Sequence, residues 1–208
     1  MAVAVVTRMR PMTRWEPNAR ARLAQAAMDL YREQGFNKTT VAEIAERAGL
    51  TERTFFRHYA DKREVLFGGA DDMKGALLAA VANAAESADP LTAAAAGFLA
   101  VGAALEEQRG RELAGQRQRL IAANAELRER ELIKLASWAS SVAETLHSRG
   151  VEEPVATLAA EVALAVFRTS FEYWTETADS PPLPDLIHES LDQLAAMHSG
   201  ATKPRIHD

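Results

Sequence analysis

TTVAEIAERAGLTERTFFRHYADKREVLF, residues 39–67, is the stretch that decides the predicted fold. Thr40 and Glu43 have the spacing of a capping box, which marks the start of a helix. Gly49 follows the apolar positions of that helix and suits its end, because glycine adopts the left-handed conformation without strain. Thr51 is then placed to cap a second helix. The stretch therefore predicts two short helices joined by a glycine turn.

The second of these helices has a polar and basic outer face. Its inward positions are Leu50, Phe55 and Tyr59. An αα-hairpin in any helical bundle can share the caps and the glycine stop. The charge favours DNA binding instead, because residues 1–63 hold 12 Lys and Arg against 7 Asp and Glu in a chain of net charge −5. Side chains suited to base edges and phosphates face outward: Glu52, Arg53, Thr54, Arg57 and His58.

The segment from Arg20 to Phe67 resembles the DNA-binding domain of the TetR family of bacterial transcriptional regulators. ARLAQAAMDLYREQGFNKTT and VAEIAERAGLTERTFFRHYADKREVLF carry the likeness, and FFRHY followed by Lys62 is its most specific part. The C-terminal part resembles the family's ligand-binding domain, and AANAELRERELIKLASWASSVAETL loosely resembles the branch of mycofactocin-system regulators. The resemblance implies an all-α fold, with a three-helix helix-turn-helix domain followed by a helical ligand-binding and dimerisation domain.

The resemblance also implies roles for single residues. Glu52 is acidic on the reading face and either accepts from cytosine N4 or balances Arg53. Arg57 stands where relatives often have an aromatic residue. The expected phosphate contacts at a helix start are Thr39 and Thr40, the expected base-edge contacts are Thr51, Arg53 and Thr54, and the expected phosphate or sugar contacts are Arg57, His58, Tyr59 and Lys62.

Four segments are expected along the chain: a flexible arm (1–16), the DNA-binding domain (17–63), the ligand-binding and dimerisation domain (64–198) and a disordered tail (199–208). The arm's arginines either reach a minor groove or belong to a solvated end. A long helix is expected from Asp61 to Ser87, and the glycines within it either permit bending and close helix approach or are packing points. Further helices are expected at 17–34, 91–108, 124–148, 154–178 and 185–198.

The last two expected helices resemble the pair that forms the family's four-helix dimer interface. Both carry small apolar residues at helical spacing. Such stripes face either their own core or a partner subunit, and the resemblance favours the partner. The expected interface residues are Val155, Leu158, Val162, Val166, Leu191 and Leu194.

The ligand site has a weaker signature in the sequence. Arginines from Arg109 to Arg119 either attract an anionic effector or form a solvated basic face, since glutamates lie among them. Aromatic and apolar residues either line an apolar pocket or belong to ordinary packing. The candidate pocket residues are Phe98, Leu105, Arg109, Trp138, Phe167, Phe171 and Trp174.

Enzymatic chemistry finds no support in the sequence. Glu144 and His147 form one Glu-x-x-His, but a di-iron bundle needs two copies. The chain has no cysteine, no phosphate-binding glycine loop and no long apolar run, so we expect no cofactor, metal site or membrane span, and a cytoplasmic location. The sequence predicts a homodimeric regulator, most simply a repressor, that a small molecule releases from a near-palindromic operator. The alternative is a constitutive or corepressor-dependent DNA-binding protein.

Overall fold

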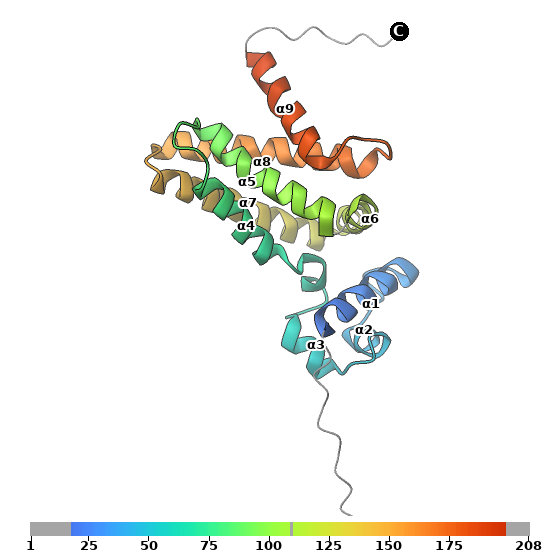
Figure 1. Cartoon of the computed structure of the whole chain (residues 1–208). Helices are drawn as coiled ribbons and strands as arrows, with labels where there is room; N and C mark the ends of the chain where they lie inside the picture. Colours follow the sequence, from blue (N-terminus) through green and yellow to red (C-terminus); the bar gives the residue numbers. More distant parts are fainter. Residues whose placement is uncertain (1–17, 109, 199–208) are drawn as a thin grey trace, which may run out of the picture. The chain divides into compact units, whose positions relative to one another are not determined.

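A computed structural model describes residues 18–108 and 110–198, and within these ranges every regular element is a helix (Figure 1). The all-α fold class is therefore confirmed. The chain divides into two compact units, Met1–Leu66 and Phe67–Asp208, whereas the sequence predicts a boundary after residue 63. The predicted N-terminal arm and C-terminal tail lie outside the described residues.

The described part of the N-terminal unit contains three α-helices, α1 (Ala19–Gln34), α2 (Val41–Arg47) and α3 (Glu52–His58) (Figure 1). They enclose a small core because each helix turns its apolar face inward. All three helices, together with the segments that flank them, contribute to this core, which includes Leu23, Ala27, Leu30, Tyr31, Phe36, Ile44, Ala45, Phe55 and Tyr59.

The turn between α2 and α3 has the geometry that the sequence predicts. Thr40 and Glu43 form a reciprocal capping box, in which each backbone amide donates to the other side chain at 2.8 and 3.2 Å. Gly49 has a φ of 64°, and the amide of Leu50 donates to the carbonyl of Ala45 at 2.8 Å. The capping box satisfies the start of α2, and the bond from Leu50 satisfies its end, where the chain turns into α3.

The predicted helix from Asp61 to Ser87 is wrong, because the chain is interrupted there. A 3₁₀ turn covers Glu64–Phe67, and α4 begins only at Ala70 and ends at Ala82. Gly69 precedes α4 with a φ of 86°, a left-handed conformation that breaks a helix. The glycines of this segment thus act partly by ending one helix before the next begins.

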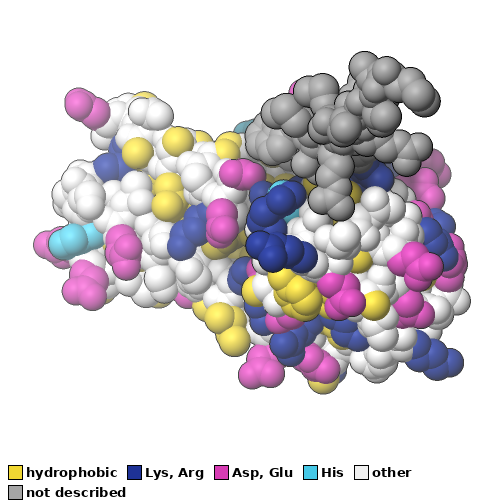
Figure 2. All heavy atoms as spheres, turned by 90° about the horizontal axis from the view of Figure 1, so that it is seen from below, with side chains coloured by type: hydrophobic (Ala, Val, Ile, Leu, Met, Phe, Trp, Pro, Cys, Tyr) yellow, Lys and Arg dark blue, Asp and Glu magenta, His cyan; other side chains and the backbone are white. Residues whose placement is uncertain are grey.

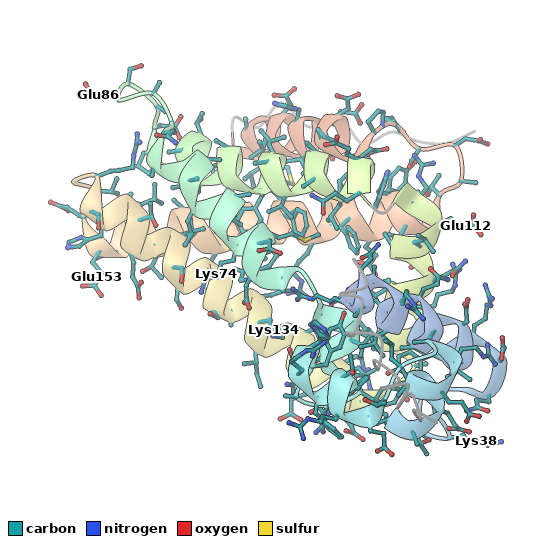
Figure 3. All side chains as sticks on the ribbon, turned by 60° about the horizontal axis from the view of Figure 1, so that its bottom comes forward. Lys38, Lys74, Glu86, Glu112, Lys134 and Glu153 are labelled. Carbon is teal, nitrogen blue, oxygen red and sulfur yellow. The ribbon has the colours of Figure 1, made fainter. Side chains whose placement is uncertain are left out.

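The C-terminal unit is a bundle of six helices: α4 (Ala70–Ala82), α5 (Pro90–Gln108), α6 (Gly110–Ala122), α7 (Ala125–Ser148), α8 (Glu153–Glu176) and α9 (Leu183–His198) (Figure 1). α5 and α7 both pack against α4 and α8, while α9 lies on α8 and α5. Two side chains fix α4 in the bundle. Lys74 (Figure 3) donates to Ser137 at 3.1 Å, and the Arg149 guanidinium donates to the carbonyls of Ala82, Ala84 and Ala85.

α8 is the central helix of this bundle. By length and composition alone it is apolar enough to cross a membrane, with a mean hydropathy of 1.3 over its most apolar window. Its buried side chains instead pack within the bundle, in contact with α5, α7 and α9. A core position therefore explains the apolar character of its buried face.

Gly97→Ala should destabilise the C-terminal unit by about 1–3 kcal/mol, the usual cost of overpacking. A β-carbon at Gly97 would lie 2.7 Å from a methyl group of Val81 and 2.9 Å from the carbonyl oxygen of Leu77, so α4 and α5 would have to separate. The matched control is Gly75→Ala, since Gly75 is exposed with nothing within 4 Å. That change should stabilise α4 by about 0.5–1 kcal/mol. Urea unfolding of both variants tests the pair, and equal effects would contradict it.

Candidate nucleic-acid interface

α3 presents a rigid polar face. The hydroxyl of Thr51 accepts from the amide of Thr54 at 3.2 Å and lies 3.1 Å from the Thr54 hydroxyl, which fixes the first turn. Phe55 is fully buried and anchors the helix from beneath. Glu52 and Arg53 of the first turn are exposed. The helix therefore holds its outward side chains on a fixed backbone, as recognition of base edges requires.

The arginines of α3 differ from four of the five other described arginines of the N-terminal unit; the exception is Arg20, which is exposed and lies over the ring of Tyr59. Arg53 and Arg57 are exposed, and neither makes a hydrogen bond or ion pair with the part of the chain that the structure describes. Elsewhere in the unit, guanidinium groups are engaged by acidic side chains or backbone carbonyls, as in Arg22–Ala48, Arg32–Asp29, Arg47–Glu33 and Arg63–Asp61. Figure 2 shows Lys and Arg side chains interspersed with Asp and Glu on one face of the molecule. The candidate cations for DNA are thus specific side chains and not a uniform basic patch.

Three predicted DNA contacts must be corrected, because their side chains have other partners. Thr39 is 1% exposed, and its hydroxyl donates to the carbonyl of Gly35 at 2.9 Å. Tyr59 is buried, and its hydroxyl donates to the carbonyl of Arg20 at 3.2 Å. Lys62 is directed at backbone carbonyls of the segment between α1 and α2. We remove these three from the candidate interface, which keeps Thr40, Thr51, Glu52, Arg53, Thr54, Arg57 and His58.

Lys62 connects the segment after α3 to the loop after α1. Its ammonium donates to the carbonyls of Phe36 and Thr39 at 2.8 Å each and to that of Asn37 at 3.4 Å. The same nitrogen lies 4.5 Å from the centre of the Phe36 ring. Its backbone carbonyl accepts the hydroxyl of Tyr31 at 2.6 Å. All three ammonium hydrogens have acceptors, so Lys62 holds the unit together. A sequence motif alone gives no signal for such a role.

His58 is half-buried at the end of α3, and its buried Nε2 has no hydrogen-bond partner among the described residues. Burial lowers the pKa of the imidazole below its ordinary 6.5, and the charges of Arg57 and Arg20 lower it further. The folded protein therefore favours the neutral ring. A neutral ring beside arginines leaves these cations as the positive charges of this region.

The shifted pKa of His58 predicts a stability that depends on pH. The unfolded chain binds a proton near pH 6.5 and the folded chain only at lower pH, so this contribution is present above about pH 6.5 and is lost as the pH falls. Urea unfolding of the wild type at pH 7.5 and at about 5.5 should show the loss. The loss should disappear in His58→Gln and persist in the control His147→Gln. An equal slope in both variants would assign the effect to other groups.

The predicted pocket residues meet in the C-terminal unit. Phe98 of α5 lies 5.4 Å from Phe167 of α8, and the series continues through Phe171 to Trp174 at 5.8 and 5.9 Å between ring centres. Leu105 and Trp138 belong to the same buried cluster. Arg109 lies outside the described residues. The indole N–H of the fully buried Trp174 has no acceptor within the described ranges. These aromatic side chains therefore belong to one hydrophobic core, and one of them carries a hydrogen-bond donor without an acceptor among the described residues.

Two of the arginines proposed for an anionic effector are engaged within the fold, whereas Arg119 is exposed. Arg111 donates to the carbonyls of Thr177, Ala178 and Ser180 in the loop after α8. Arg117 forms an ion pair with Glu131 at 2.9 Å. These contacts indicate structural roles.

A surface groove of about 280 Å³ lies elsewhere, between α7 and α8. It contains Glu144, His147, Glu153 and Glu161 but none of the predicted pocket residues. Among the described residues, no three His, Asp or Glu side chains are placed to hold a metal ion.

α8 exposes an apolar stripe along one side. Leu158 is 65% exposed, and Val155 and Tyr173 are also exposed. Val162, which lies between Leu158 and Tyr173 in the sequence, is half-buried. Val166 is 8% exposed and packs in the core of its own unit, so we remove it from the predicted interface. The two predicted leucines of α9 are half-buried against the same core: Leu191 and Leu194.

The fold and the presented helix define a class of protein, namely a helix-turn-helix regulator with a separate helical domain. Residues 23–67 match the family described as bacterial regulatory proteins, tetR family, and residues 88–199 match the family described as the MftR C-terminal domain. The second match covers more than half of the chain. The chain therefore belongs to the TetR family of transcriptional regulators, with a C-terminal domain of the MftR type.

Known relatives agree with this assignment. The HTH-type transcriptional regulator TcmR of Streptomyces glaucescens is 36% identical over 102 residues, which cover 44% of this chain and 45% of that protein. The putative mycofactocin biosynthesis transcriptional regulator MftR of Mycobacterium tuberculosis is 25% identical over 177 residues, or 84% of this chain and 88% of that one.

Solved structures share the fold. SmeT is a repressor from Stenotrophomonas maltophilia. The structure of its complex with triclosan matches this chain with a TM-score of 0.61 at 18% identity, and the match covers 90% of this chain and 96% of the SmeT chain. Thermus thermophilus FadR in complex with lauroyl-CoA has a TM-score of 0.55 at 20% identity, with 90% and 97% covered.

Proposed function

We propose that this protein is a homodimeric transcriptional repressor that binds a near-palindromic operator in the cytoplasm and is released by a small molecule. The observation that carries the proposal is the α3 face. The helix is capped by Thr51 and anchored by Phe55, and it presents two arginines that have no partner among the described residues. Such a helix can enter a major groove, where guanidinium groups bind guanine edges or phosphates. The protein acts by binding, and we assign it no catalytic activity.

The exposed stripe of α8 supports the proposed homodimer. A twofold axis beside Val155, Leu158 and Val162 would bury apolar side chains that a single subunit leaves in water. Leu191 and Leu194 of α9 would lie at the edge of the same interface. A dimer of this kind carries two α3 helices and therefore reads two half-sites about one DNA turn apart.

The effector is an apolar molecule with a hydrogen-bond acceptor. The series of rings from Phe98 to Trp174 offers apolar contact, and the unused indole N–H of Trp174 needs an acceptor. SmeT is known in complex with triclosan, and FadR in complex with lauroyl-CoA, whose acyl chain is apolar. An effector that prefers one spacing of the two reading helices would shift the dimer away from the operator.

The first experiment is selection of duplex DNA from a random pool with the purified full chain. A palindrome with half-sites about one turn apart supports the dimeric reader and supplies a probe for effectors. Selection is done at low salt, because phosphate contacts weaken steeply as salt rises. Failure to enrich any site with folded protein would contradict the proposal. A constitutive DNA-binding protein would also enrich a site, but added effectors would not release it from that site. A corepressor-dependent protein would bind its site only when the effector is present.

Arg53→Ala should weaken operator binding by about 1–3 kcal/mol if Arg53 reads a guanine, and should relax the preference at one position per half-site. The side chain is exposed in the first turn of α3, so the variant should fold normally. Titration of the variant against operators changed at single positions measures both effects. The control is Arg32→Ala, an exposed arginine of α1 that is paired with Asp29. Equal weakening on every sequence would instead make Arg53 a phosphate contact.

A further inference from the structure

Phe56 is the exception to the burial pattern of the N-terminal unit. Its side chain is 56% exposed, and within residues 18–66 it is the one large hydrophobic side chain that the structure leaves exposed. The adjacent Phe55 is fully buried, with the two rings 5.5 Å apart and nearly perpendicular. The chain therefore uses one aromatic residue to anchor α3 and turns the next one outward.

The position of Phe56 on α3 places it with the proposed base-edge contacts. It follows Glu52 by four residues and Arg53 by three, and residues at these spacings share one face of a helix. Both of those side chains are exposed. Phe56 thus continues the face that Glu52 and Arg53 begin, one turn nearer the end of the helix.

The chemistry of the side chain limits what it can recognise. A phenyl ring neither donates nor accepts a conventional hydrogen bond, so it offers nothing to phosphate oxygens or to the polar edges of bases. The C5 methyl group of thymine is the apolar group among the base edges of the major groove. A partly exposed ring gains free energy when it covers such a methyl group, because both surfaces leave water.

We propose that Phe56 packs on a thymine methyl group and specifies a T·A pair in each half-site, next to the base pair that Arg53 contacts. The inference rests on the proposed DNA-binding function and adds to it a specificity determinant that is read without hydrogen bonds. It also predicts that each selected half-site contains an invariant thymine. If Phe56 served only a contact with another protein, the selected half-sites would show no invariant thymine that depends on it.

The test is a double-mutant cycle between protein and DNA. Each thymine of the selected operator is replaced in turn by deoxyuridine, which lacks only the methyl group. For the wild type, one replacement per half-site should weaken binding about fourfold, the effect of taking one methyl-sized group out of contact. Phe56→Ala should bind the thymine operator more weakly than the wild type does. This variant should bind the thymine and deoxyuridine operators with equal affinity. Phe56→Leu, which remains apolar, should retain part of the discrimination.

Controls separate the possible failures. Phe56→Ala should keep the unfolding curve of the wild type, because the ring is exposed. If it discriminates thymine from deoxyuridine as strongly as the wild type, or if no single replacement matters to the wild type, the inference is overturned while DNA binding stands. If the wild type enriches no DNA at all, the proposed function fails, and this inference fails with it.

Discussion

Leu158→Glu should convert the protein from a dimer to a monomer. Leu158 is 65% exposed at the middle of the apolar stripe of α8, and a twofold axis would bury it in both subunits. Fully burying a leucine contributes about 1.5–3 kcal/mol, and Leu158 is already about one third buried, so its loss from both subunits should cost the dimer about 2–4 kcal/mol. A glutamate at the interface adds the cost of desolvating its charge. Sedimentation velocity over a range of concentrations measures the shift.

The matched control is Ile133→Glu on α7, because Ile133 is similarly exposed, at 63%, but lies outside the proposed interface. This variant should remain dimeric, and both variants should keep the helical circular dichroism of the wild type. Operator affinity should fall only for Leu158→Glu, since a monomer carries one reading helix. Dissociation by Ile133→Glu but not by Leu158→Glu would place the interface on α7.

Lys62→Met should destabilise the N-terminal unit by about 2–4 kcal/mol. The substitution keeps an apolar side chain of similar length beside Phe36 but removes the ammonium group, which donates to three carbonyls of one short segment. Hydrogen bonds from a charged donor contribute about 1.5–3 kcal/mol each. Because Lys62 is half-buried, water can hydrogen-bond to some of the carbonyls in the variant and offset part of this loss. Amide hydrogen exchange of α1 to α3 in the full chain should report faster opening than in the wild type.

The control for this prediction is Lys38→Met. Lys38 lies in the same loop region, its side chain is exposed, and it points outward in Figure 3. Its replacement should leave hydrogen exchange unchanged. If Lys62→Met instead keeps wild-type exchange and weakens binding equally on all DNA sequences, Lys62 is a phosphate contact after all.

Local signals account for the parts that the sequence predicted well. The capping box at Thr40, the glycine turn at Gly49 and the cap at Thr51 each act within a few residues, so their geometry is written in the order of the side chains. The sequence does not predict the break before α4, although Gly68 and Gly69 stand there. A pair of glycines weakens a helix without forbidding it, and only the φ of 86° at Gly69 shows that the helix ends.

The sequence by itself determined the family and the all-α fold, through the resemblance of its motifs to those of a known family, and the reading helix, because its caps depend on spacing along the chain. Only the tertiary structure decided which polar groups are free to bind. Lys62 and Tyr59 belong to the same motif as Arg57, yet carbonyls from distant segments occupy the first two. Val166 and Leu158 both fit one apolar periodicity, yet one is buried and the other exposed. Residues far apart in sequence come into contact only when the chain folds, and these contacts decide which side chains are buried and which polar groups are hydrogen-bonded.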